Sequence, residues 1–501
     1  MGLVGARMDD QPGQEGGDRV TDLLLVNPLS LREDPVEQRL MTPYFPLGLL
    51  YLAAVARQAG YSVALFDGMF SQGLDEAFVA ALKREQPRVV GISVLATVRS
   101  AALRLAGLGD QHGATVIVGG ADPTGRPESY LRHQVDGRRP IDLAVVGEGE
   151  QTLTEVLPLL LDAGQGPRYE ELSQVAGLAF LDADGRLVTT PARQHCTNLD
   201  SLPLPARELV DLETYRGAWR SRHGYFSMSL IATRGCPFGC TWCQKSVFGR
   251  SYRPRSPQKV AEEMGLIKTA YQPDQLRIVD DVMGIDRRWV RAWHDAVLAQ
   301  GAAIPFECLS RVDLLDDELA RLLAEAGCRR IALGAESGSQ KVLDAMKKGT
   351  TVEQIRRAAE LCRRHGIETY FYIMLGYPCE KWADIRQTVE LLKETHPDRF
   401  SSTIAYPLPG TDFYTEVAHR LLDTPDWDYT AENRLLFERE YSTRFYHWVQ
   451  RWIYQEWWAA RLRHGKEHAS LARRLRHQAG LWTARGMVEI LRHRPPTTSS
   501  P

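Results

Sequence analysis

The sequence predicts an α/β protein in which a doubly wound, Rossmann-like parallel sheet precedes a (β/α)6-type partial barrel and a C-terminal helical cap. Two observations predict the sheets. Five apolar runs alternate with helical patterns before residue 150, and six more do so between residues 229 and 406. Such alternation favours parallel sheets whose strands are buried between helices. A third observation predicts the cap, because strand patterns stop near residue 412 while aromatic and helical residues continue.

The expected elements divide the chain into five parts. Strands of the first sheet are expected over residues 22–27, 61–67, 88–94, 114–120 and 142–147, with a helix over 46–58. Barrel strands are expected over 229–233, 275–279, 305–310, 330–334, 369–375 and 400–406. The predicted parts are a disordered leader (1–19), a first domain (20–165), a linker with a short strand pair (166–223), the barrel (224–414) and the cap (415–501). Several domains are expected at 501 residues.

Composition limits the kind of partner and the compartment. A hydrophobic content of 44% and a net charge of -2 give no electrostatic reason to expect nucleic acid. No run of about 18 apolar residues is present, and the N-terminus lacks the apolar core of a signal peptide. Three of the eight cysteines fall within eight residues, unlike a disulfide framework. We therefore expect a cytoplasmic protein without a transmembrane segment.

The motif Cys236-x3-Cys240-x2-Cys243 is the strongest chemical signal in the chain. It follows an expected strand, at the end where α/β folds place ligands, and Gly235 and Gly239 permit a tight loop. Structural zinc needs a fourth ligand, and none lies near in sequence, although a distant residue could supply one. Three thiolates on an iron-sulfur cluster leave one iron open to a small molecule. These cysteines are the predicted metal ligands and the catalytic centre.

This segment resembles the signature of the radical S-adenosylmethionine (SAM) superfamily, in which an aromatic residue, here Trp242, precedes the third cysteine. The resemblance implies a 4Fe-4S cluster that binds SAM and cleaves it to a 5'-deoxyadenosyl radical. It also implies contacts between SAM and residues at the ends of later strands. The candidates are Asp280 and Asp281 for the amino group, Ser310, Arg311, Glu336 and Ser337 for the carboxylate and ribose, and Gly376 beside adenine. Cys379 is either a packed residue or a hydrogen-atom donor.

The first domain resembles the cobalamin-binding domain of B12-dependent radical SAM enzymes. The resemblance rests on landmarks such as Gly91-Ile-Ser-Val94 and Gly147-Glu-Gly-Glu150, and it implies cobalamin contacts at Asn27, Ser93, Gly119, Gly120, Gly147 and Glu148. The domain lacks an Asp-x-His-x-x-Gly motif, and His112 should lie at the opposite end of its strand. We therefore expect bound cobalamin without histidine ligation. A nucleotide site or an empty fold is the alternative.

The resemblance implies the function. In this family one SAM methylates cobalt(I), another yields the radical, and the substrate radical captures methyl from methylcobalamin. We expect a methyltransferase acting on an unactivated carbon, or phosphinate phosphorus, of a small metabolite, served by a low-potential electron donor of flavodoxin or ferredoxin type. Residues 244–257 are similar to the branch that contains anaerobic magnesium-protoporphyrin monomethyl ester cyclase and P-methylases. A cyclase or ring-rearranging enzyme is therefore an alternative. A non-enzymatic metal- or corrinoid-binding module is another.

The predicted cap is expected to close the barrel mouth and to help choose the substrate. Glu438 and Tyr441 are candidate substrate contacts because of their location. Trp448 and Trp452 lie one helical turn apart, a spacing more typical of a helix core than of a substrate platform.

Overall fold

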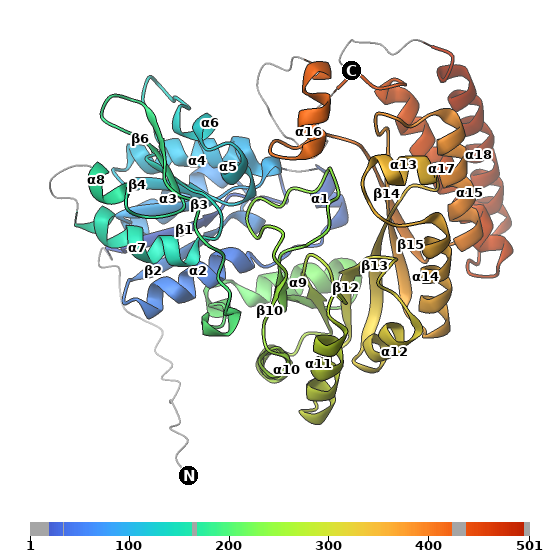
Figure 1. The fold of residues 1–501 in the computed structure, drawn as a ribbon, viewed down its shortest axis with the longest axis horizontal. Coiled ribbons are helices and arrows are strands. Elements are labelled where there is room, and N and C mark those ends of the chain that lie inside the picture. Colours follow the sequence, from blue (N-terminus) through green and yellow to red (C-terminus); the bar gives the residue numbers. More distant parts are fainter. Residues whose placement is uncertain (1–19, 34, 163–167, 423–436, 495–501) are drawn as a thin grey trace.

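The computed structural model describes residues 20–33, 35–162, 168–422 and 437–494 (Figure 1). The leader predicted over residues 1–19 lies outside this part of the chain. The described residues form two large sheets side by side and a small two-stranded sheet, with two long C-terminal helices on the side of the barrel away from the first sheet. This arrangement agrees with the fold class that the sequence predicts.

The first sheet has the strand order β2-β1-β3-β4-β5-β6-β7. Strands β1 to β5 are parallel, whereas β6 and β7 are antiparallel to their neighbours. The strands are β1 (Leu23–Asn27), β2 (Val63–Asp67), β3 (Val89–Ser93), β4 (Thr115–Gly119), β5 (Leu143–Val145), β6 (Leu178–Leu181) and β7 (Leu187–Thr189). The predicted linker thus supplies two strands, so the sheet continues past residue 165. The exact domain boundaries stay a prediction.

Helices cover both faces of the first sheet because successive strand residues point to opposite sides. In β1, Leu23 and Leu25 pack with α2 and α7, whereas Leu24 and Val26 pack with α3 and α4. Both faces are therefore apolar and buried, as expected for a doubly wound sheet. The helices of this half are α1 (Pro35–Leu40), α2 (Leu47–Gln58), α3 (Leu74–Glu85), α4 (Arg99–Gln111), α5 (Ala121–Gly125), α6 (Glu128–Leu131), α7 (Glu150–Leu161) and α8 (Tyr169–Leu172).

The second sheet is the expected six-stranded parallel half-barrel, in the order β15-β14-β13-β12-β11-β8. Its strands are β8 (Ser227–Leu230), β11 (Gln275–Ile278), β12 (Phe306–Ser310), β13 (Cys328–Glu336), β14 (Glu368–Leu375) and β15 (Arg399–Ile404). Its helices are α10 (Pro257–Leu266), α11 (Arg287–Ala299), α12 (Asp317–Glu325), α13 (Gln340–Ala345), α14 (Val352–Arg364) and α15 (Trp382–Thr395). Because the strands are parallel, all their carboxyl ends meet at one rim.

Helix α9 (Leu212–His223) joins the two halves. Its Tyr215 hydroxyl donates to Asp67 at the end of β2 (2.7 Å), and the Tyr215 ring stacks on Phe45 with centroids 4.5 Å apart. The Trp219 indole N–H donates to the Pro43 carbonyl at 2.8 Å. Apolar residues of the first sheet and of the barrel belong to one continuous core around this helix. The two halves are therefore packed against each other rather than tethered.

The C-terminal region is helical, as predicted, with α16 (Asp412–Val417), α17 (Thr443–Arg463) and α18 (Leu471–Leu491). Helix α17 runs along the β15 edge, where Gln450 donates to the Ser402 carbonyl and Trp457 to the Pro397 carbonyl, each at 2.8 Å. Trp452 stacks on Trp382 of α15 at 5.4 Å. Helices α17 and α18 flank the sheet, and closure of the barrel mouth by this region stays a prediction. The predicted helix-core role of Trp452 is confirmed by its burial. No described helix is long and apolar enough to cross a membrane.

Candidate active site

The cysteine loop connects two short paired strands at the rim of the barrel. Strand β9 (Thr233–Arg234) pairs antiparallel with β10 (Arg253–Pro254), and the loop begins directly after Arg234. Gly235 has φ +83°, and a Cβ built there would lie 2.1 Å from the Ser251 carbonyl oxygen. Only glycine fits this position. Gly235 therefore forms the turn by which the chain leaves β9 and enters the cysteine loop at Cys236.

The three cysteines differ in exposure and in charge. Cys236 is half-buried, Cys240 is buried and Cys243 is exposed. A hydrogen bond between the thiols of Cys240 and Cys243 lowers the pKa of Cys240 to about 6, and the same bond raises the pKa of Cys243. Lys348, Arg311 and Lys245 add positive charge that also lowers the pKa of Cys240. The loop thus favours a thiolate, the form that binds iron.

Arg311, at the end of β12, lies against this loop. Its Nη1 is 3.6 Å from the Cys240 sulfur, and its guanidinium carbon is 3.7 Å from the centre of the Phe238 ring. Asp313 binds the same guanidinium at 2.9 and 3.1 Å. Arg311 therefore lies beside Cys240, and Asp313 balances its charge; contact between Arg311 and SAM stays a prediction.

Thr241 anchors the loop to the far side of the barrel. Its amide donates to the Met346 carbonyl at 3.1 Å, and its hydroxyl lies 2.9 Å from the Tyr377 hydroxyl. The Phe413 amide donates to the Thr241 carbonyl at 3.0 Å. The cysteine loop therefore reaches across the rim and meets the loop that follows β14.

The acidic pair after β11 has two different roles. Asp280 is buried, and its two oxygens accept hydrogen bonds from the Ala232 amide (2.7 Å) and the Thr233 hydroxyl (2.9 Å). Asp281 is exposed and accepts one bond, from the Gly235 amide at 3.0 Å. Burial raises the pKa of both, that of Asp280 to about 7. Asp281 is thus the better placed to receive an ammonium group, which stays a prediction for both.

Glu336 and Trp242 share a cation that sequence reasoning missed. Lys348 is buried and pairs with Glu336 (Nζ to Oε1, 3.0 Å), and its Nζ lies 5.2 Å from the centre of the Trp242 ring. A Cβ at Gly334 would lie 2.5 Å from both partners, so glycine leaves room for the pair. Glu336 itself has φ +58°. The Lys347-Lys348-Gly-Thr350 run after α13 was the available signal.

The two predicted serine contacts, Ser310 and Ser337, form hydrogen bonds within the protein. Ser310 donates to the Met283 carbonyl at 2.7 Å. Ser337 is fully buried and bonds the Thr388 hydroxyl (3.2 Å) and the Ser339 amide (3.1 Å). These bonds hold the turns after β12 and β13. Contact between either serine and SAM stays a prediction, and the hydrogen bonds give each a structural role instead.

Gly376 follows β14 with φ +78°, and its amide donates to Glu380 at 2.6 Å. A Cβ at this position would lie 3.2 Å from the Tyr446 ring and 3.3 Å from Cδ of Arg439. Cys379, three residues on, is half-buried and packs against the apolar cluster that contains Tyr377. This packing agrees with the structural role considered for Cys379.

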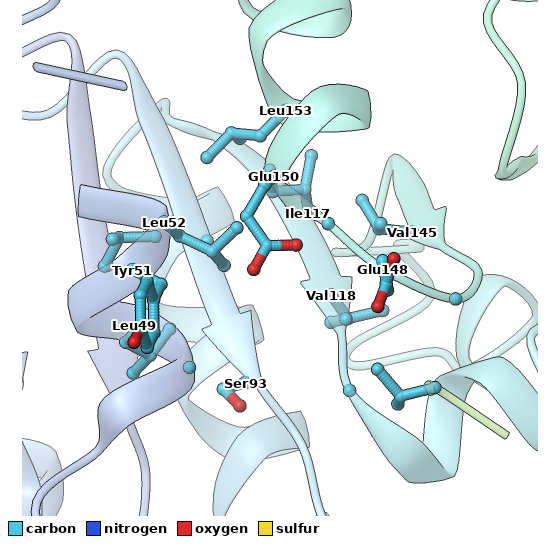
Figure 2. Close-up of a pocket in the computed structure, with 18 of the residues that line it drawn as sticks. Leu49, Tyr51, Leu52, Ser93, Ile117, Val118, Val145, Glu148, Glu150 and Leu153 are labelled. Carbon is cyan, nitrogen blue, oxygen red and sulfur yellow. The ribbon is translucent and has the colours of Figure 1, made fainter. Parts of the chain in front are cut away.

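A pocket opens at the carboxyl ends of β3, β4 and β5 in the first domain (Figure 2). Figure 2 shows apolar side chains of α2, β4 and α7 around it, with Glu148 and Glu150 reaching into it. Five of the six predicted cobalamin contacts line it: Ser93, Gly119, Gly120, Gly147 and Glu148. Gly120 has φ +107°, and a Cβ there would lie 2.7 Å from the Val94 carbonyl oxygen. The close approach of the Val94 backbone therefore requires glycine in the turn after β4.

Asn27 is the exception among the predicted cobalamin contacts, because it does not line the pocket. It is buried and donates to Asp67 at 2.8 Å, which ties the ends of β1 and β2 together. No histidine is among the described residues that line the pocket. His112 caps α4 before β4, at the opposite end of the sheet as expected. Cobalamin without histidine ligation remains a prediction.

The barrel supplies the other wall of this pocket, from Ile231, Arg234, Val247 and Phe248. Arg234 pairs with Glu150 at 2.6 Å, and Arg253 pairs with Glu148 at 2.7 Å. All four side chains are buried. Sequence reasoning missed the two arginines, although both flank the cysteine loop in the sequence. The pocket wall and the cysteine loop are therefore one connected unit.

The residues fit the cofactors that they are expected to hold. Nowhere in the described chain do three or more His, Cys, Asp or Glu side chains converge as ligands of a single ion. A 4Fe-4S cluster instead distributes its thiolates over separate iron atoms. A soft-sulfur donor set beside three cations suits that cluster, and the largely apolar pocket suits a bulky heterocycle.

Comparisons with known proteins agree with this geometry. A model of the radical SAM superfamily matches residues 230–392. A model of the B12-binding domain matches residues 39–157. The chain therefore contains a radical SAM domain and a B12-binding domain. The family uses a 4Fe-4S cluster, SAM and cobalamin, so the expected cofactors are confirmed at this level.

Several relatives match most of the length of this chain. An uncharacterised methyltransferase of Pyrococcus horikoshii is 27% identical over 82% of this chain and 86% of its own. Anaerobic magnesium-protoporphyrin IX monomethyl ester cyclase of Rubrivivax gelatinosus is 27% identical over 75% and 67%. Cytidylyl-2-hydroxyethylphosphonate methyltransferase of Streptomyces wedmorensis is 26% identical over 74% and 77%. The predicted branch is therefore confirmed.

Solved structures share the fold. The radical SAM methyltransferase TsrM of Kitasatospora setae, solved with cobalamin and a [4Fe-4S] cluster, has a TM-score of 0.64 at 21% identity, over 80% of this chain and 78% of that chain. The cobalamin-dependent enzyme OxsB, solved with aqua-cobalamin, has a TM-score of 0.69 at 18% identity, over 94% and 72%. The order of the two sheets is thus common to this group.

Proposed function

We propose that this protein is a methyltransferase that adds a methyl group to an unactivated carbon, or a phosphinate phosphorus, of a small molecule. The observation that carries the proposal is the Arg234–Glu150 pair. Arg234 directly precedes the cysteine loop, and Glu150 lines the pocket of the B12-binding domain. A methyl carrier in the pocket and a radical source on the loop would therefore lie at one interface. Two of the relatives reported above are named as methyltransferases.

The chain's own residues prepare both sites. Apolar side chains around the pocket exclude water, and Arg234 lies 5.4 and 4.9 Å from the ring centres of Tyr51 and Phe248. Lys348 and Arg311 place positive charge beside Cys240, which favours the thiolate. When bound, the cluster supplies the electron that cleaves SAM, and cobalamin supplies a transferable methyl group. Asp281 would hold the SAM amino group through its exposed carboxylate.

Reconstitution tests this function. The full chain is loaded anaerobically with iron, sulfide and hydroxocobalamin, reduced at low potential, and given methyl-labelled SAM. We expect both 5'-deoxyadenosine and S-adenosylhomocysteine, and label in the product once a substrate is found. Formation of 5'-deoxyadenosine alone, with unlabelled product, would reject methyl transfer. Stoichiometric zinc without iron would instead support the non-enzymatic binding module.

An oxidative cyclase or ring-rearranging enzyme is the second candidate. The Rubrivivax relative, named as a cyclase, favours it because it matches 75% of this chain. The same labelling experiment separates the two reactions, since a cyclase transfers no methyl group to its product.

Reduction of the cluster requires an electron donor, which we propose to be of low-potential flavodoxin or ferredoxin type. We also propose a cytoplasmic location. All eight cysteines are free, and an exposed cysteine such as Cys243 would stay reduced and able to bind iron only in a reducing compartment. Co-purification of iron with the protein from anaerobic cells tests this location.

A further inference from the structure

Among the residues that the structure describes, no carboxylate pairs with the Arg439 guanidinium. Its Nη2 donates to the Ala405 carbonyl at 2.7 Å, and its Cζ lies 4.7 Å from the centre of the Phe437 ring. Its Nε is buried and makes no hydrogen bond within the described chain. Burial lowers the pKa of Arg439 to about 10. Buried charges are ordinarily paired, so this group requires an explanation.

The nearest buried carboxyl is Glu380, which accepts the Gly376 amide at 2.6 Å; burial raises its pKa to about 8, so it is protonated and neutral at pH 7. The acidic residues on either side of Arg439 in the sequence have other contacts. Glu438, a candidate substrate contact, is exposed, and its amide donates to the Arg420 carbonyl at 2.9 Å. Glu440 pairs with Lys381 at 2.5 Å. Tyr441, the other candidate, accepts the Trp382 amide at 3.1 Å. Neither flanking carboxylate therefore pairs with Arg439 in the described part of the chain.

Arg439 lies at the rim of the barrel, close to the cysteine loop. Ala405 follows β15, and Gly376, whose added Cβ would meet Arg439, follows β14. Tyr377, the next residue, bonds Thr241 of the cysteine loop. Parallel α/β folds place substrates at this end of the strands.

Tyr446 adds a second unsatisfied donor at the same place. A Cβ built at Gly376 would lie within 3.4 Å of both the Tyr446 ring and Cδ of Arg439, so the two side chains pack against the same glycine. The Tyr446 hydroxyl is buried and makes no hydrogen bond to any described residue. An arginine and a phenol with unused N–H and O–H groups form a donor set for an oxyanion.

We propose that Arg439 and Tyr446 bind an oxyanion of the substrate, a carboxylate or a phosphate, at the barrel rim. This inference rests on the proposed function, because it takes the rim as the substrate site. It narrows the substrate class to small molecules that carry an anionic group. Arginine suits this task because its planar fork matches carboxylate and phosphate oxygens.

Anion binding by the reconstituted full chain tests the proposal without turnover. Sodium phosphate, sodium acetate and SAM are titrated separately, and thermal protection gives a half-saturating concentration for each. We expect phosphate or acetate to protect the protein, Arg439→Met to raise the half-saturating concentration at least tenfold, and Arg439→Lys and Tyr446→Phe to raise it about threefold. The matched control is Arg451→Met, because exposed Arg451 also lies on an aromatic ring, 4.6 Å from Trp448. Its half-saturating concentration should not change.

Three outcomes would overturn the proposal. In the first, neither phosphate nor acetate protects the wild-type protein against heat. In the second, the two anions protect wild type and Arg439→Met equally. In the third, Arg439→Met weakens the binding of SAM instead of the anions, which would make Arg439 a cofactor contact. If Arg439→Met does not fold, Arg439→Lys and Tyr446→Phe decide alone. Since no turnover is measured, failure here and failure of methyl transfer are separate results.

Discussion

Arg234 Nη2 lies 2.6 Å from Glu150 Oε1, and both side chains are buried where the first sheet meets the barrel. Glu150 begins α7 beside the cobalamin pocket, and Arg234 ends the strand before Cys236. Buried ion pairs add little net stability, but removing one partner is costly because a charge is left unpaired. This pair therefore fixes the position of the cysteine loop relative to the pocket.

Glu150→Gln should destabilise the protein and weaken cobalamin binding together. Loss of one partner of a buried pair costs about 3 kcal/mol. Urea denaturation of the apoprotein and cobalamin titration by absorbance measure the two effects. The matched control is Glu128→Gln, whose exposed pair with Arg132 should contribute less than about 1 kcal/mol. Equal effects of the two variants would show that the Arg234–Glu150 pair does not position the loop.

Gly235→Ala should reduce cluster incorporation. The new Cβ would lie 2.1 Å from the Ser251 carbonyl oxygen in a backbone conformation that alanine disfavours, so the loop must shift. Gly239→Ala, in the same loop, meets nothing within 4 Å and is the control. We expect the iron content and the visible absorbance of the cluster to fall several-fold in Gly235→Ala and to remain at the wild-type level in Gly239→Ala. Normal iron content in Gly235→Ala would contradict the fit of this loop.

Substitutions of the acidic pair should separate cofactor binding from stability. Asp281→Asn removes the exposed carboxylate and should weaken SAM binding about tenfold, with little change in stability. Asp280→Asn disturbs buried bonds to Ala232 and Thr233 and should lower stability by roughly 1–3 kcal/mol. Equilibrium dialysis with SAM and urea denaturation measure the two effects. Weakened SAM binding only in Asp280→Asn would reverse the assignment.

The sequence predicted the strands well because buried parallel strands are continuous apolar runs. All five expected strands of the first sheet and all six of the barrel are present, with ends shifted by a few residues. The motifs also placed side chains at the correct end of each strand. The direction of each of these side chains depends on the alternation along the strand and on the shape of the following turn. A pattern of residue types does not determine this direction. Ser337 and Asn27 therefore lie beside the site but bond elsewhere.

The sequence did not reveal the charged side chains whose partners lie on distant elements of the fold. Lys348 meets Glu336 and Trp242 only after α13 turns back over the rim. Arg234 meets Glu150 only when the two sheets pack together. Such contacts depend on the angle between elements, which periodicity leaves undetermined. The route of β6 and β7 into the first sheet is missed for the same reason.

Glu380→Gln should change how stability depends on pH. Glu380 is fully buried, burial raises its pKa to about 8, and its Oε1 makes no hydrogen bond within the described chain. Between the unfolded pKa near 4.5 and the folded value, the folded state holds a proton that the unfolded state has lost. Stability should therefore fall as pH rises through this window, by up to about 1.4 kcal/mol per pH unit from this group.

Glutamine keeps an oxygen for the Gly376 amide but carries no ionisable proton, so the variant should match wild type near pH 5 and exceed its stability at pH 8. Urea denaturation of the apoprotein at both pH values measures the difference, with exposed Glu390→Gln as the control. A variant that is equally destabilised at pH 5 and pH 8 would show that the Glu380 carboxyl is needed for packing and that its ionisation does not govern this part of the fold. A stability gain at pH 8 alone would instead identify Glu380 as a carboxyl that is kept neutral by burial beside the rim.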